Sequence, residues 1–191
     1  MGTNGEGVGR IDHYTVFVPY VLPGEVVTVK ITTVKKNYSV GELVEIVEPS
    51  PHRQEAPCPL YGTCGGCQLQ HTTYEHQLAL KTQKVKDVVS RIGGVDESLV
   101  RPALGPENPW AYRNKMQMPV GGSGKDIHMG FYKRGSHDIV DGTDCLIQRQ
   151  GNNEIARVCY DLAHKLGVEP YNETTGRGFL RHVIGRIGQS K

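Results

Sequence analysis

The sequence lacks any hydrophobic run long enough to cross a membrane. Its longest apolar stretches, such as Val16 to Val18, fall far short of the ~20 residues that a membrane helix needs. No basic stretch followed by an apolar one opens the chain, so a secretion signal is not expected either. Charged residues make up 22% and hydrophobic residues 37%, which excludes a disordered tail. We therefore expect a soluble, globular, cytoplasmic protein without membrane partners.

The sequence also lacks a strong charge of either sign. Its formal net charge is +2, which is too weak by itself to indicate nucleic-acid binding. The basic excess lies in the second half of the chain, so any basic surface is expected there. A length of 191 residues allows one or two ordinary domains.

An even number of cysteines, which a disulfide framework would require, is missing as well. The chain has five, and thiols in the cytosol are kept reduced, so metal or redox chemistry is favoured. Three of them, Cys58, Cys64 and Cys67, have the spacing C-x5-C-x2-C, with two glycines between the last two, and Cys145 lies far downstream. Four thiolates suit tetrahedral zinc or a four-iron four-sulfur cluster. Zinc usually takes two close pairs, so three clustered cysteines plus one remote cysteine favour iron-sulfur and leave zinc as the alternative.

The fifth cysteine, Cys159, has a different setting. It lies on the apolar stripe of a helix predicted over residues 152–166, together with Ile155, Val158, Leu162 and Leu166. A cysteine in this position behaves as a small core residue, and we expect no reactive role for it.

Periodicity predicts the remaining elements. Alternating apolar residues between Pro-Gly turns predict short antiparallel strands over 14–18, 27–31 and 42–47, which together form a small β-barrel in residues 1–50. A long helix is predicted over 74–92, with Thr72 and Glu75 as a capping box and Gly93 as the stop. Further strands are expected between residues 104 and 145 and over 179–187.

The string Cys-Pro-Leu-Tyr-Gly-Thr-Cys-Gly-Gly-Cys-Gln-Leu-Gln-His, residues 58–71, resembles the cluster motif of the iron-sulfur RNA (uracil-5-)-methyltransferases. The strings at 7–10, 16–19 and 22–25 look like the TRAM domain, an OB-like RNA-binding barrel that precedes the cluster in many members. Those at 112–115, 130–132 and 144–145 look like the central domain of this family. The resemblance covers the whole chain, in the order in which the family arranges these parts.

The resemblance implies both a cofactor and an activity. In the family, the thiolates corresponding to Cys58, Cys64, Cys67 and Cys145 hold a four-iron four-sulfur cluster with a structural and RNA-positioning role. The enzymes use S-adenosylmethionine to methylate C5 of uracil, here most plausibly in 23S ribosomal RNA. The family's catalytic cysteine, carboxylate base and cofactor site lie in a C-terminal Rossmann-like domain.

No G-x-G-x-x-G follows a predicted strand, and no spare cysteine sits in a loop near a carboxylate. We therefore expect an α+β, β-rich chain that lacks the Rossmann-like domain, contains no catalytic or cofactor-binding residue and is inactive by itself. The expected domains are the TRAM barrel in residues 1–50, with its first strand clipped, and a central iron-sulfur domain in 51–72 and 105–191. The helical excursion 73–104 is expected to pack on the absent catalytic domain, and its exposed helix 74–92 to allow self-association.

Cations beside aromatic residues suggest where RNA would bind. Aromatic faces can stack on splayed bases while neighbouring cations contact phosphates. The candidate RNA-binding residues are Lys35, Lys36, Arg113, Lys115, Lys133 and Arg134. Two other classes of function stay open: a free-standing RNA-binding adaptor with a structural metal site, and a zinc-stabilised module without affinity for RNA.

Overall fold

The computed structural model describes residues 1–124 and 126–188, which form two compact units. Unit 1 comprises residues 1–57 and 68–105, and unit 2 comprises residues 58–67 and 106–191. These divisions differ from those expected from the sequence, because the helical segment 73–104 groups with the N-terminal strands. Of the cysteine-rich segment, only residues 58–67 join unit 2. Residues 125 and 189–191 of the predicted central domain lie outside the described residues.

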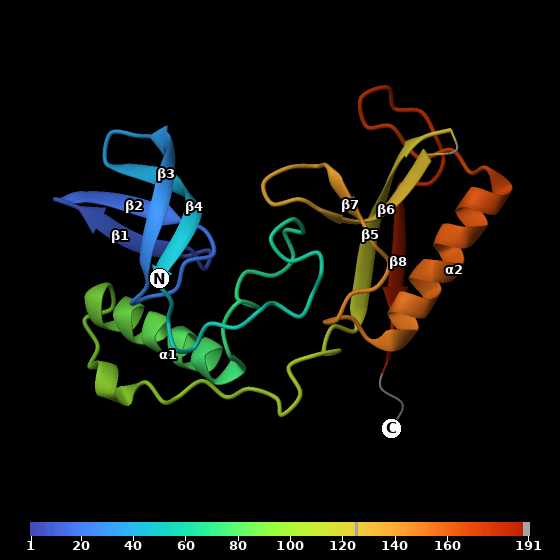
Figure 1. Ribbon diagram of the computed structural model, residues 1–191. Helices are drawn as coiled ribbons and strands as arrows, with labels where there is room; N and C mark the ends of the chain where they lie inside the picture. The colour runs from blue at the N-terminus through green and yellow to red at the C-terminus, as the bar shows by residue number, and fades with distance from the viewer. Residues whose placement is uncertain (125, 189–191) are drawn as a thin grey trace. The chain divides into compact units, whose positions relative to one another are not determined.

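Unit 1 is built on a four-stranded sheet of β1 (Gly7–Ile11), β2 (Tyr14–Val18), β3 (Val26–Val34) and β4 (Tyr38–Glu48) (Figure 1). The strand order is β1-β2-β4-β3, with β2 and β4 parallel and the other pairs antiparallel. Strand β1 has no counterpart among the strands predicted from periodicity. Its glycines interrupt the alternation of apolar residues from which strands were predicted. Gly7 is required by close packing, because a Cβ at this position would lie 2.7 Å from the Cβ of Val21.

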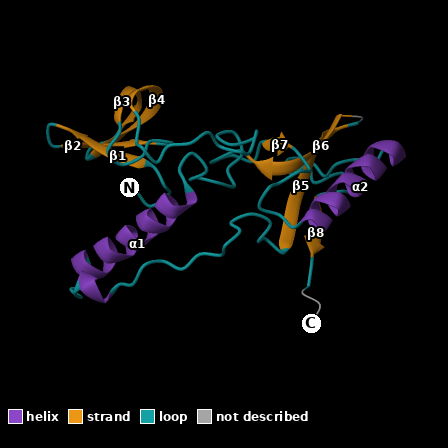
Figure 2. Cartoon of the chain, turned by 60° about the horizontal axis from the view of Figure 1, so that its bottom comes forward, coloured by secondary structure: helices purple, strands orange, loops and turns teal. Residues whose placement is uncertain are grey.

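The core of unit 1 is small. Val16, Val18 and Val21 form its buried cluster, with Val27, Val29 and Leu43 packed against it. Beyond the sheet lie helix α1 (Tyr74–Arg91) and the 3-10 turn η1 (Glu97–Leu99), and Figure 2 shows α1 as a single continuous helix.

The helix over 74–92 is confirmed to within one residue, but its predicted capping box is wrong. Helix α1 follows Thr73, which makes no side-chain capping bond. The hydroxyl of Thr72 instead donates to the carbonyl of His52, at 3.0 Å. Much of the predicted apolar stripe faces solvent: Val85 is 49% exposed and Ile92 is 83% exposed.

Unit 2 is an antiparallel sheet of β5 (Lys115–Ser123), β6 (Asp126–Tyr132), β7 (Ile139–Asp141) and β8 (His182–Arg186), in the order β7-β6-β5-β8. Helix α2 (Gln150–Leu166) lies along it (Figure 1). The core between them is rich in methionine. Its buried members are Met116, Met118, Val120, Ile127, Met129, Ala156, Ala163 and Val183.

The second predicted helix is confirmed, but the face that it buries is not the expected one. Its end follows the prediction, since Gly167 adopts the left-handed conformation at φ 61°. Its buried residues are Asn152, Ala156 and Ala163, whereas the aliphatic stripe from Ile155 to Leu166 is largely exposed. Small side chains let the helix approach the sheet, and the long methionines fill the space between.

None of the helices in the described residues is both long and apolar enough to span a membrane.

Candidate metal centre and nucleic-acid interface

The three clustered cysteines lie in a tight loop of unit 2. All five cysteines are of intermediate exposure. The amide of Tyr61 donates to the carbonyl of Cys58 at 3.0 Å, and the amide of Cys64 donates to Leu60 at 2.8 Å. The amide of Gly66 then points back at the sulfur of Cys64, 3.4 Å away. Amides directed at sulfur favour the thiolate form that binds metals.

This cysteine loop, residues 58–67, is fixed against the end of β6. The amide of Gly65 donates to the carbonyl of Tyr132 at 2.9 Å, and Cys64 forms an antiparallel bridge with Lys133. A Cβ on Gly65 would lie 3.1 Å from the backbone of Arg134. Glycine is therefore needed at this position for the loop to approach the strand so closely.

Cys145 is held by the first turn of α2. Its amide donates to the Asn153 side chain at 3.3 Å, and the Asn153 amide group donates back to the Cys145 carbonyl at 3.1 Å. Asn153 positions Cys145, and the spacing of the cysteines did not predict this role. A polar residue eight positions after the cysteine, at the start of a helix, was the available signal.

The four candidate ligands influence one another's ionisation. Burial raises the pKa of the Cys64 thiol, the Gly66 amide lowers it, and the neighbouring Cys145 and Cys58 raise it further. Burial likewise raises the pKa of Cys145, against two backbone amides that lower it, and Cys67 and Cys58 add to the rise. The fold thus brings the remote cysteine within electrostatic reach of the clustered three. Cys159 packs against the methionine-rich core, as expected.

Within residues 1–124 and 126–188, no group of three or more His, Cys, Asp or Glu side chains is already arranged to hold a metal ion. The donor set still suits one, because four half-buried thiols share a single region of unit 2. Thiolates without carboxylates fit zinc or an iron-sulfur cluster rather than a hard cation.

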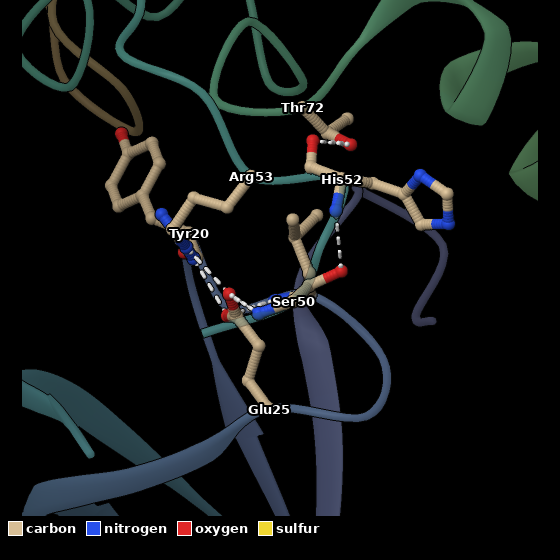
Figure 3. A network of polar contacts seen from close by, with 7 residues as sticks. Tyr20, Glu25, Ser50, His52, Arg53 and Thr72 are labelled. Carbon is tan, nitrogen blue, oxygen red and sulfur yellow. Dashed lines mark hydrogen bonds and ion pairs between the residues drawn. The ribbon is translucent and has the colours of Figure 1, made fainter. Parts of the chain in front are cut away.

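A buried ion pair, absent from the sequence-based prediction, closes one end of the β3–β4 hairpin in unit 1 (Figure 3). The Glu25 side chain is fully buried and accepts two hydrogen bonds from the Arg53 guanidinium. The amides of Leu22 and Ser50 also donate to it, at 2.8 and 3.1 Å. Arg53 donates further to the Tyr20 carbonyl, at 2.8 Å. Burial opposes ionisation of Glu25, but these donors outweigh it and lower its pKa to about 2.

A buried histidine lies beside this pair. Burial and the Arg53 charge lower the pKa of His71 to about 4, and the Glu25 charge opposes them in part. His71 is only 4% exposed, so near neutral pH it is an uncharged imidazole packed edge-on against Tyr20. His71 belongs to unit 1, whereas the cysteine loop belongs to unit 2.

The candidate RNA-binding residues divide between the two units. Lys35 and Lys36 occupy the turn between β3 and β4, where the Tyr14 hydroxyl donates to the carbonyls of Lys35 and Tyr38. Lys133 and Arg134 occupy the turn between β6 and β7. Arg113 and Lys115 lie at the start of β5, where the amide of Arg113 donates to the Ile147 carbonyl at 2.8 Å.

Residues 2–44, which contain β1, β2, β3 and the start of β4, match the family model of the TRAM domain. This segment of the chain is therefore similar to TRAM domains. This confirms the N-terminal resemblance, and RNA-methyltransferase homologues extend the likeness along the rest of the chain.

Three of these homologues are proteins named uncharacterized RNA methyltransferase. The one from Halalkalibacterium halodurans is 45% identical over 187 residues, which are 98% of this chain and 41% of that protein. Those from Bacillus cereus and Clostridium tetani are each 46% identical over 186 residues, 97% of this chain and 40% of theirs. The chain therefore spans about two-fifths of the length of the curated relatives that it matches.

A solved structure shares the fold. It is the Pyrococcus abyssi tRNA (uracil-54, C5)-methyltransferase in complex with S-adenosyl-L-homocysteine, with a TM-score of 0.67 and 24% identity over 98% of this chain and 44% of that one. The predicted fold class is corrected by this match. The sequence pattern led us to define the chain as a fragment without a Rossmann-like domain, whereas 98% of it follows the fold of a methyltransferase. The error was to take the absence of a G-x-G-x-x-G motif and of a spare cysteine as evidence about the fold class.

Proposed function

We propose that this chain recognises RNA for an S-adenosylmethionine-dependent RNA (uracil-5-)-methyltransferase, with 23S ribosomal RNA as the substrate. The observation that carries the proposal is the combination of a TRAM domain with homologues named RNA methyltransferases along nearly the whole chain. The methyltransferase with the shared fold is named as a uracil-C5 enzyme in complex with S-adenosyl-L-homocysteine, which supports both the reaction and the methyl donor. We assign no catalytic or donor-binding role to any described residue.

We propose further that Cys58, Cys64, Cys67 and Cys145 hold a four-iron four-sulfur cluster. The mutual influence of these thiols on their pKa values and the amide directed at Cys64 support the site. Such a cluster supplies a rigid cross-link and can also supply electron-transfer chemistry. Here the protein's own contribution is mechanical. The cysteine loop that would carry the cluster is hydrogen-bonded to Tyr132, forms a bridge with Lys133 and lies close to the backbone of Arg134, so ordering the loop orders the base of the β6–β7 turn.

The two turns with paired cations, Lys35-Lys36 and Lys133-Arg134, are proposed to contact phosphates, together with Arg113 and Lys115. Exposed cations on hairpin turns can follow a strand of RNA without deforming the sheets that carry them. A cytoplasmic location is part of the proposal, because cysteines that hold a metal centre need a reducing compartment to escape disulfide formation. Self-association through α1 is included too, since Val85, Val88 and Ile92 form an exposed apolar stripe.

The proposal is tested by titrating the chain with a labelled fragment of 23S ribosomal RNA and, separately, with a transfer RNA, at several salt concentrations. Phosphate contacts require that affinity falls steeply with salt. Salt-dependent binding that prefers the ribosomal fragment supports the proposal as stated. Preference for transfer RNA would replace the ribosomal substrate, and absence of binding to either RNA would overturn RNA recognition.

A further inference from the structure

The turn between β6 and β7 places one aromatic ring on another beside the paired cations. The ring of His137 stacks on the ring of Tyr132, with centroids 4.9 Å apart and planes inclined by 16°. Tyr132 is the last residue of β6, and it pairs with Ile139, the first residue of β7. The rigid edge of the sheet therefore supports the inner ring of the stack.

The outer ring is held in position from a second side. Nδ1 of His137 lies 3.2 Å from Oε2 of Glu173, and the other oxygen of this carboxylate lies 3.0 Å from Nη2 of Arg181. Arg181 in turn sits 5.0 Å above the centre of the Tyr171 ring. A carboxylate can only accept hydrogen bonds, so this contact requires the tautomer in which Nδ1 of His137 carries the hydrogen.

Although clamped in this way, the His137 side chain is 76% exposed. One ring face is covered by Tyr132, so the exposed area belongs largely to the opposite face and the edge. A flat aromatic face that is backed by a second ring and open to solvent is what a splayed nucleic-acid base stacks on. A ring free to rotate would lose more conformational entropy on binding.

Cations flank this face. Lys133 and Arg134 follow Tyr132 directly and are exposed, and the ammonium group of Lys133 makes a long contact with Asp138, 3.7 Å between Nζ and Oδ2. An ion pair between two exposed groups contributes little, so a phosphate can replace it at small cost. Ring face and cations thus lie on one six-residue turn, within the span of neighbouring nucleotides.

We propose that the outer face of His137 is a stacking site for one unpaired RNA base, with Lys133 and Arg134 contacting the adjoining phosphates and Glu173 acting as the positioning residue. This inference rests on the proposed RNA-binding function and adds to it a named base site. It also gives the cysteine loop a role in RNA binding, because that loop is hydrogen-bonded to Tyr132, whose ring supports His137.

The test compares two probes of equal length: a labelled RNA of about twelve uridines, and the same backbone without bases. Stacking requires a base, whereas phosphate contacts do not. The full chain with His137→Ala is expected to lose about tenfold in affinity for the uridine probe and less than about twofold for the abasic probe. His137→Phe, which keeps a flat ring, is expected to stay within about threefold of the wild type on both.

Two further variants sharpen the result. His164→Ala is the matched control, because His164 also lies against a tyrosine of unit 2, with centroids 4.3 Å apart, but at a tilt of 51° on α2. It should leave both affinities unchanged. Glu173→Ala removes a negative charge, which by itself strengthens binding to both probes. A positioning role instead predicts that the ratio of uridine to abasic affinity falls.

The outcomes separate the two proposals. Equal affinity of His137→Ala and wild type for the uridine probe, with wild-type binding intact, would overturn the stacking site and leave RNA recognition standing. An equal loss on both probes would likewise overturn it, since the change would then act on the fold or the charge. Failure of the wild type to bind RNA at all would instead refute the function on which the inference rests.

Discussion

The two units secure their cation-bearing turns in different ways. In unit 1, the Glu25–Arg53 pair ties together the residues just before β3 and just after β4, at the end of the hairpin opposite Lys35 and Lys36. In unit 2, the cysteine loop is bonded to the cation-bearing turn itself. The first arrangement needs no bound group, because the Glu25 carboxylate and the Arg53 guanidinium are partners for each other. The second carries four cysteines, and we propose that a metal centre held by them reinforces it.

The largest effect on this difference between the two units is expected from a substitution of Cys145. Changing Cys145 to Ser removes one of the four proposed ligands and is expected to abolish cluster binding and destabilise unit 2, because the free energy of binding contributes to folding. Metal analysis and amide hydrogen exchange over residues 133–138 would measure this, with exchange in unit 1 unchanged. Cys159→Ser is the matched control and should retain the metal, because Cys159 packs in the core. Equal metal loss in both variants would refute the ligand set.

The same comparison is tested in unit 1 by Arg53→Met. This change leaves the buried Glu25 carboxylate without its charged partner, so unfolding free energy of unit 1 should fall by about 3–5 kcal/mol, measured by denaturant titration. Adding Glu25→Leu should recover only part of that loss, because it removes the unpaired charge but leaves the amides of Leu22 and Ser50 without their acceptor. Arg10→Met, on the exposed face of β1, provides the control and should change stability by less than about 0.5 kcal/mol. A similar loss in Arg10→Met would contradict the special role of the pair.

Acid should weaken unit 1 through two groups. His71, with its pKa lowered to about 4, binds fewer protons folded than unfolded between pH 4 and 6.5, and Glu25 does so between about 2 and 4.5. In both intervals the unfolding free energy must decrease as pH falls, by about 3 kcal/mol at most for each group.

Thermal unfolding of unit 1 across this pH range measures the effect. His71→Gln is expected to flatten the curve between pH 4 and 6.5, whereas His13→Gln, at an exposed position, should leave it unchanged. A curve of the same slope in wild type and His71→Gln would show that His71 does not carry the dependence.

The smallest expected effect concerns the two pairs of cations. Replacing Lys35 and Lys36 by Gln, or Lys133 and Arg134 by Gln, should each reduce the slope of log affinity against log salt by up to about 1.4, since about 0.7 is lost for each phosphate contact on a single strand. Anisotropy titrations with the uridine probe would measure both slopes. A pair whose removal leaves the slope unchanged does not contact phosphate, and the two units would then differ in function as well as in support.

Local patterns were readable from the sequence, and long-range ones were not. The C-terminal ends of both helices were predicted from a periodic apolar stripe and a terminal glycine, such as Gly167. Both features are properties of residues that are close in the sequence. The Glu25–Arg53 pair joins residues that are 28 positions apart in the sequence, and no local pattern near either residue predicts the other.

The prediction of the buried face of α2 was wrong for a related reason. Periodicity favoured the larger aliphatic residues, but close approach to a methionine-rich sheet selects alanine and Asn152, whose amide donates to the Asn114 carbonyl. The cysteine spacing indicated which thiols belong together, whereas the Asn153 that holds Cys145 became visible only in the fold.

The central claim is that four thiols of unit 2 hold a cluster that secures an RNA-contacting turn. Its most direct test is the iron, zinc and acid-labile sulfide content of the chain purified without oxygen, measured with its visible spectrum. The account predicts about four irons and four sulfides per chain. One zinc without sulfide would contradict the cluster and show that the four cysteines of unit 2 form a structural zinc site.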